Sequence, residues 1–180
     1  MLQIILNDGE QWDEEKQEFV SGKSHVLQLE HSLVSLSKWE SKWGKPFLTS
    51  KDKSAEEILD YIKCMTITQN VKPEIYNMLN NSNIEQINQY IGSPMTATYF
   101  SDNSAKKSNN EIVTSELIYY WMIALNIPFE CQKWHLNRLL TLIKVCNIKN
   151  QPPKKMSRRE LMSRNAALNA SRRKQYNTRG

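Results

Sequence analysis

Residues 115–146 read SELIYYWMIALNIPFECQKWHLNRLLTLIKVC, and this stretch decides the fold. Two segments, Thr114–Leu125 and Trp134–Cys146, are apolar on nearly every face when they are drawn as helices. Helices of that kind lie in the centre of a core rather than half exposed to solvent. The stretch therefore predicts two central helices with a break at NIPFEC between them, and it places Trp121 and Trp134 in the core.

An amphipathic helix is expected upstream of this stretch, beginning at Ser32. Leu36, Trp39 and Trp43 recur at spacings of three and four residues, which is the repeat of one helix face. Gly44 follows directly and is a typical residue for the end of a helix. These residues on one face are expected to pack into the core.

Three signals then mark the starts of further helices. Ser54 and Glu57 have the spacing of a capping box, in which each side chain binds a free amide of the first turn. Pro73 suits the first turn of the next helix because proline lacks the amide hydrogen that is unpaired there. Ser82 and Glu85 repeat the spacing of a capping box. The sequence thus predicts one longer and two short helices in this part.

The N-terminus shows a different pattern. The segments LQIIL and HVLQLEH are short and rich in Ile, Leu and Val, and they flank an acidic, polar stretch. Such segments are typical of an antiparallel pair of strands. Only five Gly and six Pro occur in 180 residues, which disfavours a sandwich or barrel with many tight turns. The predicted fold class is mainly α, with a small N-terminal antiparallel β element, a helical bundle and a basic C-terminal helical tail.

Charge divides the chain into two parts. The last thirty residues hold nine Lys or Arg and one acid, a net charge of +8, whereas the whole chain is only +5. Residues 151–180 begin with QPPKK, and the two prolines cannot continue a helix. We therefore expect a mostly helical globular body at 1–150, with a hinge loop near 101–110 where the sequence is SDNSAKKSNN, and a basic tail with a short helix at 151–180.

The tail helix is expected to start at a third capping box, formed by Ser157 and Glu160. Leu161 and Leu168 lie on one side of this helix, and arginines surround them. The apolar stripe is too narrow for a helix that lies on a membrane. Three interpretations remain open: an arm that binds nucleic-acid phosphates, a docking helix for another protein, and a solubilising tail. The candidate partner-binding residues are Arg158, Arg159, Leu161, Met162, Arg164, Leu168, Arg172 and Arg173.

No pattern in the sequence indicates a catalytic, cofactor or metal site. His25, His31 and His135 are not at metal-binding spacing to one another or to a cysteine. The phosphate-binding loop, the dinucleotide-binding fingerprint and the serine-hydrolase elbow are missing from the sequence. The acidic residues between Asp8 and Glu18 are expected to form a solvated turn, since paired carboxylates need burial to separate their pKa values. We therefore expect that the protein is not an enzyme.

Composition also bears on the compartment. The longest apolar stretch, Leu117–Phe129, contains Asn126 and Pro128 and falls short of the roughly 20 residues that span a bilayer. The three cysteines form no C-x-x-C pair and their number is odd, so a disulfide framework is not expected. We therefore expect that the protein is located in a reducing cytoplasm and is not associated with a membrane.

Five stretches carry a resemblance to a known family: LEHSLVSLSKWESKW, DYIKCMTITQNV, PMTATYF, SELIYYWMIALNIPFECQKWHLNRLLTLIKVC and PPKKMSRRELMSRNAALNASRRKQYNTRG. From about Leu29 onward the chain resembles the tail assembly chaperones of long-tailed, siphovirus-like bacteriophages. The resemblance implies a protein without catalytic residues that keeps the long, helical tape measure protein soluble until tail tube subunits polymerise around it.

The same resemblance implies that the chain acts in the host bacterial cytoplasm, with the tape measure protein and possibly the tail tube protein as partners. Related systems also make a longer form by ribosomal frameshifting. Two alternatives stay open at this point. The chain could be a nucleic-acid-binding phage protein that uses its basic tail, or a structural tail or connector component.

Overall fold

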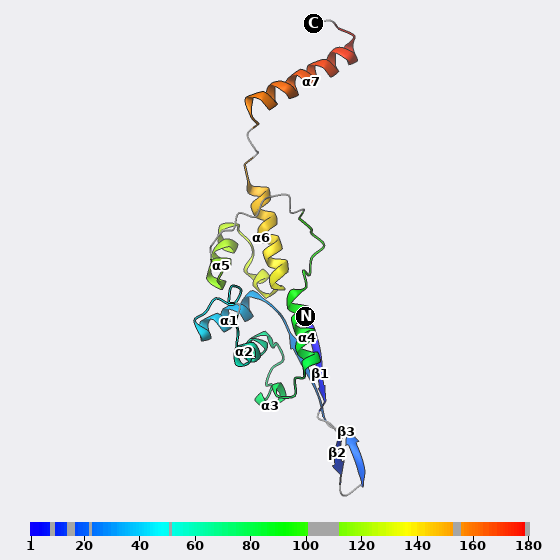
Figure 1. Ribbon diagram of the computed structural model, residues 1–180, viewed down its shortest axis with the longest axis vertical. Coiled ribbons are helices and arrows are strands. Elements are labelled where there is room, and N and C mark those ends of the chain that lie inside the picture. The colour runs from blue at the N-terminus through cyan, green and yellow to red at the C-terminus, as the bar shows by residue number, and fades with distance from the viewer. Residues whose placement is uncertain are drawn as a thin grey trace. The chain divides into compact units, whose positions relative to one another are not determined.

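A computed structural model describes residues 1–7, 10–13, 17–21, 23–50, 52–100, 112–152 and 156–178 (Figure 1). The chain forms two compact units, Met1–Asn147 and Ile148–Gly180. The predicted fold class is confirmed, because most of the chain is helical and a small antiparallel sheet lies at the N-terminus. The predicted hinge loop at 101–110 lies outside the described residues, as do residues 8, 9 and 14–16 of the acidic turn between Asp8 and Glu18.

The predicted strand pair is present. Strand β1 (Leu2–Asn7) pairs with β4 (Ser24–Leu29) in an antiparallel register that sets Ile4 opposite Leu27. Alternate side chains on these strands are buried, as the period of a strand requires. A second hairpin, formed by β2 (Glu10–Asp13) and β3 (Glu18–Ser21), was not predicted. Its strands have four residues each, which is too few for a hydrophobic alternation to stand out in the sequence.

Helices α1 (Leu33–Trp43) and α2 (Ala55–Met65) begin where the sequence indicates, and α1 also ends where it indicates. Ser32 caps α1, and Gly44 ends it with a φ of 61°, a left-handed conformation that glycine adopts without steric cost. The predicted capping box at the start of α2 is formed by Ser54 and Glu57. The two helices pack against each other.

Helices α3 (Pro73–Tyr76) and α4 (Asn81–Gly92) follow, and the start of α4 corrects the sequence interpretation. The capping box of α4 is formed by Asn80 and Asn83, not by Ser82 and Glu85. Both pairs have the required spacing, and asparagine at the cap satisfies a free amide as well as serine does. The helix therefore begins two residues earlier than Ser82 would place it.

The two predicted central helices are α5 (Ser115–Ala124) and α6 (Leu136–Asn150), and a short 3-10 helix, η1 (Phe129–Lys133), lies at the predicted break. The expectation that both helices are buried on nearly every face is wrong for both, because α5 and α6 each bury only three of their residues. Tyr120 is 63% exposed and Ile123 is 60% exposed. Trp121 and Trp134 are only half-buried, and both pack at the edge of the core rather than within it.

The core of the first unit consists of two clusters that share α1. Trp39 of α1 belongs to the N-terminal cluster, which the sheet, α2, α3 and α4 complete. Leu33 and Leu36 of α1 belong to the C-terminal cluster, which α5, η1 and α6 complete. The N-terminal cluster comprises Ile4, Leu6, Leu27, Leu29, Trp39, Tyr61, Ile62, Met65, Tyr76, Ile87 and Tyr90. The C-terminal cluster comprises Leu33, Leu36, Ile118, Met122, Ile127, Cys131, Leu136, Leu139 and Ile143.

Candidate functional site

The second unit contains helix α7 (Arg158–Tyr176), which is 19 residues long and so exceeds the short helix that the sequence predicts. The predicted capping box is formed. The Ser157 hydroxyl accepts a hydrogen bond from the Glu160 amide at 3.2 Å, and the Glu160 carboxylate accepts one from the Ser157 amide at 2.9 Å. The Ser157 hydroxyl also donates to this carboxylate at 3.0 Å, and the bonds that the Ser157 amide and hydroxyl donate to it lower the pKa of Glu160. Asn177 ends the helix in a left-handed conformation.

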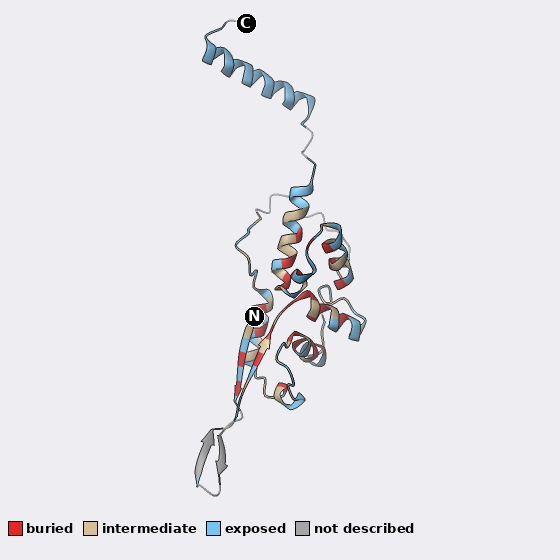
Figure 2. Cartoon of the chain, turned by 180° about the vertical axis from the view of Figure 1, so that it is seen from behind, coloured by how far each residue is buried: buried red, intermediate tan, exposed pale blue. Residues whose placement is uncertain are grey.

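Every candidate binding residue on α7 is exposed, and the helix buries none of its side chains (Figure 2). Leu161 is 48% exposed, and Leu168 lies two turns further along the same side of the helix. In a globular protein the apolar residues of a helix normally pack on a core. The structure thus places the predicted residues on one helix, and no side chain of this helix is buried.

The charge on α7 is almost entirely positive. The helix carries five arginines and Lys174, and its single acidic residue is Glu160 in the cap. Met156, just before the helix, accepts a hydrogen bond on its sulfur from Arg164 at 3.7 Å. The surface therefore offers separate cationic groups around a short apolar stripe, which suits a partner that has both apolar and acidic side chains.

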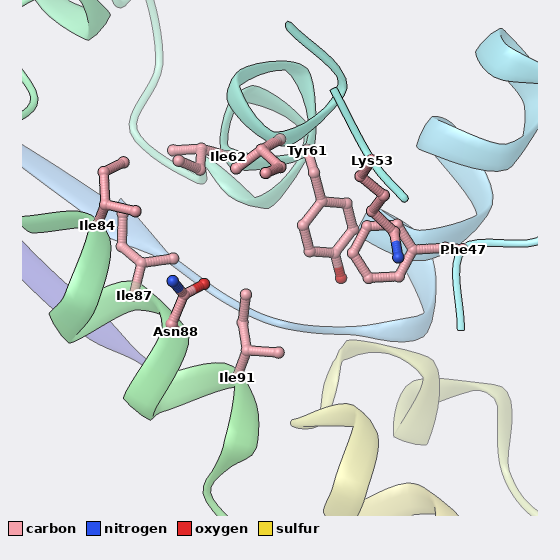
Figure 3. A pocket seen from close by; sticks show the side chains of 9 residues that line it. Phe47, Lys53, Tyr61, Ile62, Ile84, Ile87, Asn88 and Ile91 are labelled. Atoms are coloured by element: carbon pink, nitrogen blue, oxygen red, sulfur yellow. The ribbon is translucent and has the colours of Figure 1, made fainter. Parts of the chain in front are cut away.

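A second candidate surface was not foreseen from the sequence. It is an apolar groove of about 320 Å³ between α2 and α4 (Figure 3). Ile62 of α2 and Ile84 and Ile91 of α4 line the groove, and the Tyr61 ring projects from α2 beside the Phe47 ring. Ile58 of α2 also lines it. The spacings of these isoleucines are helical in the sequence, but spacing alone cannot show that two apolar faces leave a space between them.

Two polar side chains line this groove. The Lys53 ammonium lies 4.5 Å from the centre of the Phe47 ring and donates a hydrogen bond to the Ser50 carbonyl at 2.5 Å. Asn88 lies between Ile87 and Ile91 on α4 and points towards the groove in Figure 3. Burial lowers the pKa of Lys53, because a charged ammonium is poorly solvated there.

Two buried histidines could in principle carry chemistry, but they are closed to substrate. His31 and His135 stack edge to face at 5.1 Å between ring centres, and both are buried. His31 Nδ1 lies 2.6 Å from the Tyr61 hydroxyl, and His135 Nε2 donates to the Tyr90 carbonyl at 3.0 Å. Their partners are structural elements of the core. We interpret the two histidines as a buried hydrogen-bonded network that connects the two clusters.

No cluster of three or more His, Cys, Asp or Glu that could hold a metal ion occurs among the described residues. The helices in these ranges also include none with the length and apolar character needed to cross a bilayer. Cys64, Cys131 and Cys146 are free thiols.

Comparison with known proteins gives no further guide to the site. No family model, no curated protein and no solved structure matches the chain.

Proposed function

We propose that the chain is a bacteriophage tail assembly chaperone that binds the tape measure protein through α7 and keeps it soluble in the host bacterial cytoplasm. The observation that carries this proposal is the exposure of α7: a capped helix of 19 residues that buries no side chain in its own chain. In proteins, most of the stability of a helix comes from tertiary packing rather than from intrinsic helix propensity. Packing against a partner would supply the contacts that α7 lacks.

The resemblance of the sequence to tail assembly chaperones supports the identity of this partner. A tape measure chain is long and helical, and it exposes apolar stripes until the tube encloses it. The side of α7 that holds Leu161 and Leu168 can cover part of such a stripe, and the arginines beside them pair with acidic side chains. Both core clusters consist of residues of the first unit, so the tail is not needed to build that core.

Co-expression with the tape measure protein of the same phage tests the proposal. We expect Leu161→Asp with Leu168→Asp to abolish co-purification, because two carboxylates replace the apolar stripe. Ser163→Asp with Ala170→Asp is the matched control, since these residues have the same spacing and lie on the opposite side of α7. We expect the control to retain the partner. Equal recovery of the partner with both variants would contradict the proposal.

A chain that ends at Asn150 provides a second readout. We expect this truncated protein to stay folded, because both clusters lie before that residue, and to leave the tape measure protein insoluble. If the tail instead binds nucleic acid, generic DNA will bind the full chain with a steep salt dependence that the two leucine substitutions do not change. That result would favour the nucleic-acid alternative and overturn the role of α7 in chaperoning.

A further inference from the structure

The groove between α2 and α4 has the size of a site for protein side chains. Its volume of about 320 Å³ lies at the lower end of the range for small-molecule pockets, which is about 300 to 1,000 Å³. Five isoleucines and the Phe47 and Tyr61 rings form most of its walls, and one of these isoleucines, Ile58, is 40% exposed. Apolar surface of this kind gains free energy when another apolar group removes it from water.

The positive charge of Lys53 makes the groove prefer a partner that carries a negative charge. Its ammonium is partly buried over the Phe47 ring, and its hydrogen bond goes to the Ser50 carbonyl rather than to a carboxylate. The nearby Glu57 carboxylate is already engaged by Lys45 and by the Ser54 amide. None of the ion pairs among the described residues includes Lys53. A cation in this position is best stabilised by a carboxylate from outside the chain.

The same charge argues against two other occupants. Helix α7 of a second copy would bring arginines close to the Lys53 ammonium, and like charges in a partly buried site repel. A nucleic acid would supply phosphates but nothing to fill aliphatic walls, since its recognition depends on charge, base edges and stacking. A protein helix with apolar and acidic residues satisfies both parts of the groove.

We propose that the groove accepts an aliphatic side chain from an acidic amphipathic helix of a partner protein, and that a carboxylate one turn away on that helix pairs with Lys53. Recognition of this type lays the apolar face of a helix into an apolar groove. Asn88 is placed to donate to or accept from the same helix. The inference stands apart from the proposed function, because it involves neither α7 nor the identity of the partner.

Two synthetic peptides serve as probes, each a helix of about four turns with one stripe of leucines. They differ only in the residues that flank the stripe, which are Glu in one peptide and Lys in the other. The full chain with labelled isoleucine methyl groups is titrated with each peptide in an NMR experiment. We expect the acidic peptide to shift the methyl signals of Ile58, Ile84 and Ile91, and to bind about tenfold more tightly than the basic peptide.

Lys53→Glu is expected to reverse this preference. The substituted residue directly precedes the cap of α2, where a negative charge suits the helix N-terminus, so the fold should persist. Lys63→Glu is the matched control, because Lys63 is an exposed residue of α2 that does not line the groove. We expect it to leave the preference unchanged. Equal binding of the two peptides to the unsubstituted chain, or the lack of shifts at the three isoleucines with either peptide, would overturn the proposal.

Discussion

At the scale of the residue, His31 is a titratable side chain that is buried in the folded protein. Burial lowers its pKa from 6.5 to about 4, and the neighbouring His135 acts in the same direction. Burial lowers the pKa of His135 as well. Because a carbonyl can only accept, His135 Nε2 carries the hydrogen, and Nδ1 has no hydrogen-bond partner in the described part of the protein. A second proton on this ring would be a buried charge without a partner.

The sign of the pH dependence follows from these shifts. Between pH 6.5 and about 4 the unfolded chain binds a proton at His31 that the folded chain does not, so stability falls as the pH falls through this window. A shift of this size corresponds to about 3 kcal/mol once the window has been crossed. We expect the free energy of unfolding, measured in urea, to drop by about 2 kcal/mol between about pH 7 and about pH 5.

His31→Gln removes the titrating group and keeps a polar side chain, so we expect most of that drop to disappear in this variant. If the variant and the unsubstituted protein lose the same free energy over this range, His31 is not the source of the pH dependence.

At the scale of the element, the start of α4 shows which of two possible capping residues, Asn80 or Ser82, is used. The sequence alone presents the two as equivalent. Asn80 forms reciprocal hydrogen bonds with Asn83, whereas Ser82 already lies within the helix. We expect Asn80→Ala to lower the free energy of unfolding by about 1 kcal/mol, the usual cost of losing a cap. Ser82→Ala is the control and should change it by less than about 0.5 kcal/mol. A larger cost for Ser82→Ala would show that α4 begins where the sequence suggested.

The elements also show how far the sequence could lead. Ser54, Pro73 and Ser157 mark helix starts through local chemistry, and the structure has helices at these positions. The exposure of Tyr120 was not predictable, because an apolar helix face does not reveal whether another element covers it.

The two candidate sites, α7 and the groove, also differ in how far the sequence could predict them. The exposure of α7 follows from its composition of charged and small residues, which cannot pack as a core. The groove depends on how α2 and α4 meet, and these helices are brought together by tertiary packing rather than by local sequence. No pattern within either helix could have predicted it.

At the scale of the whole molecule, α1 joins the two clusters of the first unit. Its Trp39 packs in one cluster, and its Leu36 packs in the other. A hydrogen bond from the Leu136 amide to the His31 carbonyl, at 2.7 Å, connects the same region to the start of α6. Because α1 forms part of both clusters, neither cluster can unfold without exposing apolar side chains of the other to water.

We therefore expect a single unfolding transition for residues 1–150. Leu36→Ala should lower the free energy of unfolding by about 2 to 5 kcal/mol, since Leu36 is fully buried. In each of the two proteins, tryptophan fluorescence and far-ultraviolet circular dichroism should report the same unfolding midpoint as each other. Two separated transitions, with the variant shifting only one of them, would show that the clusters unfold independently.

The sharing of α1 has a consequence for the chain as it leaves the ribosome. All residues of the N-terminal cluster have been synthesised once Ile91 is added, but the partners of Leu33 and Leu36 come later, from α5 to α6. At a synthesis rate of about 5 to 20 residues per second, this side of α1 stays uncovered for roughly 3 to 10 seconds. During this interval the nascent chain exposes apolar surface of its own. A protein that we propose to shield another chain from aggregation would thus pass through a brief stage in which it needs shielding itself.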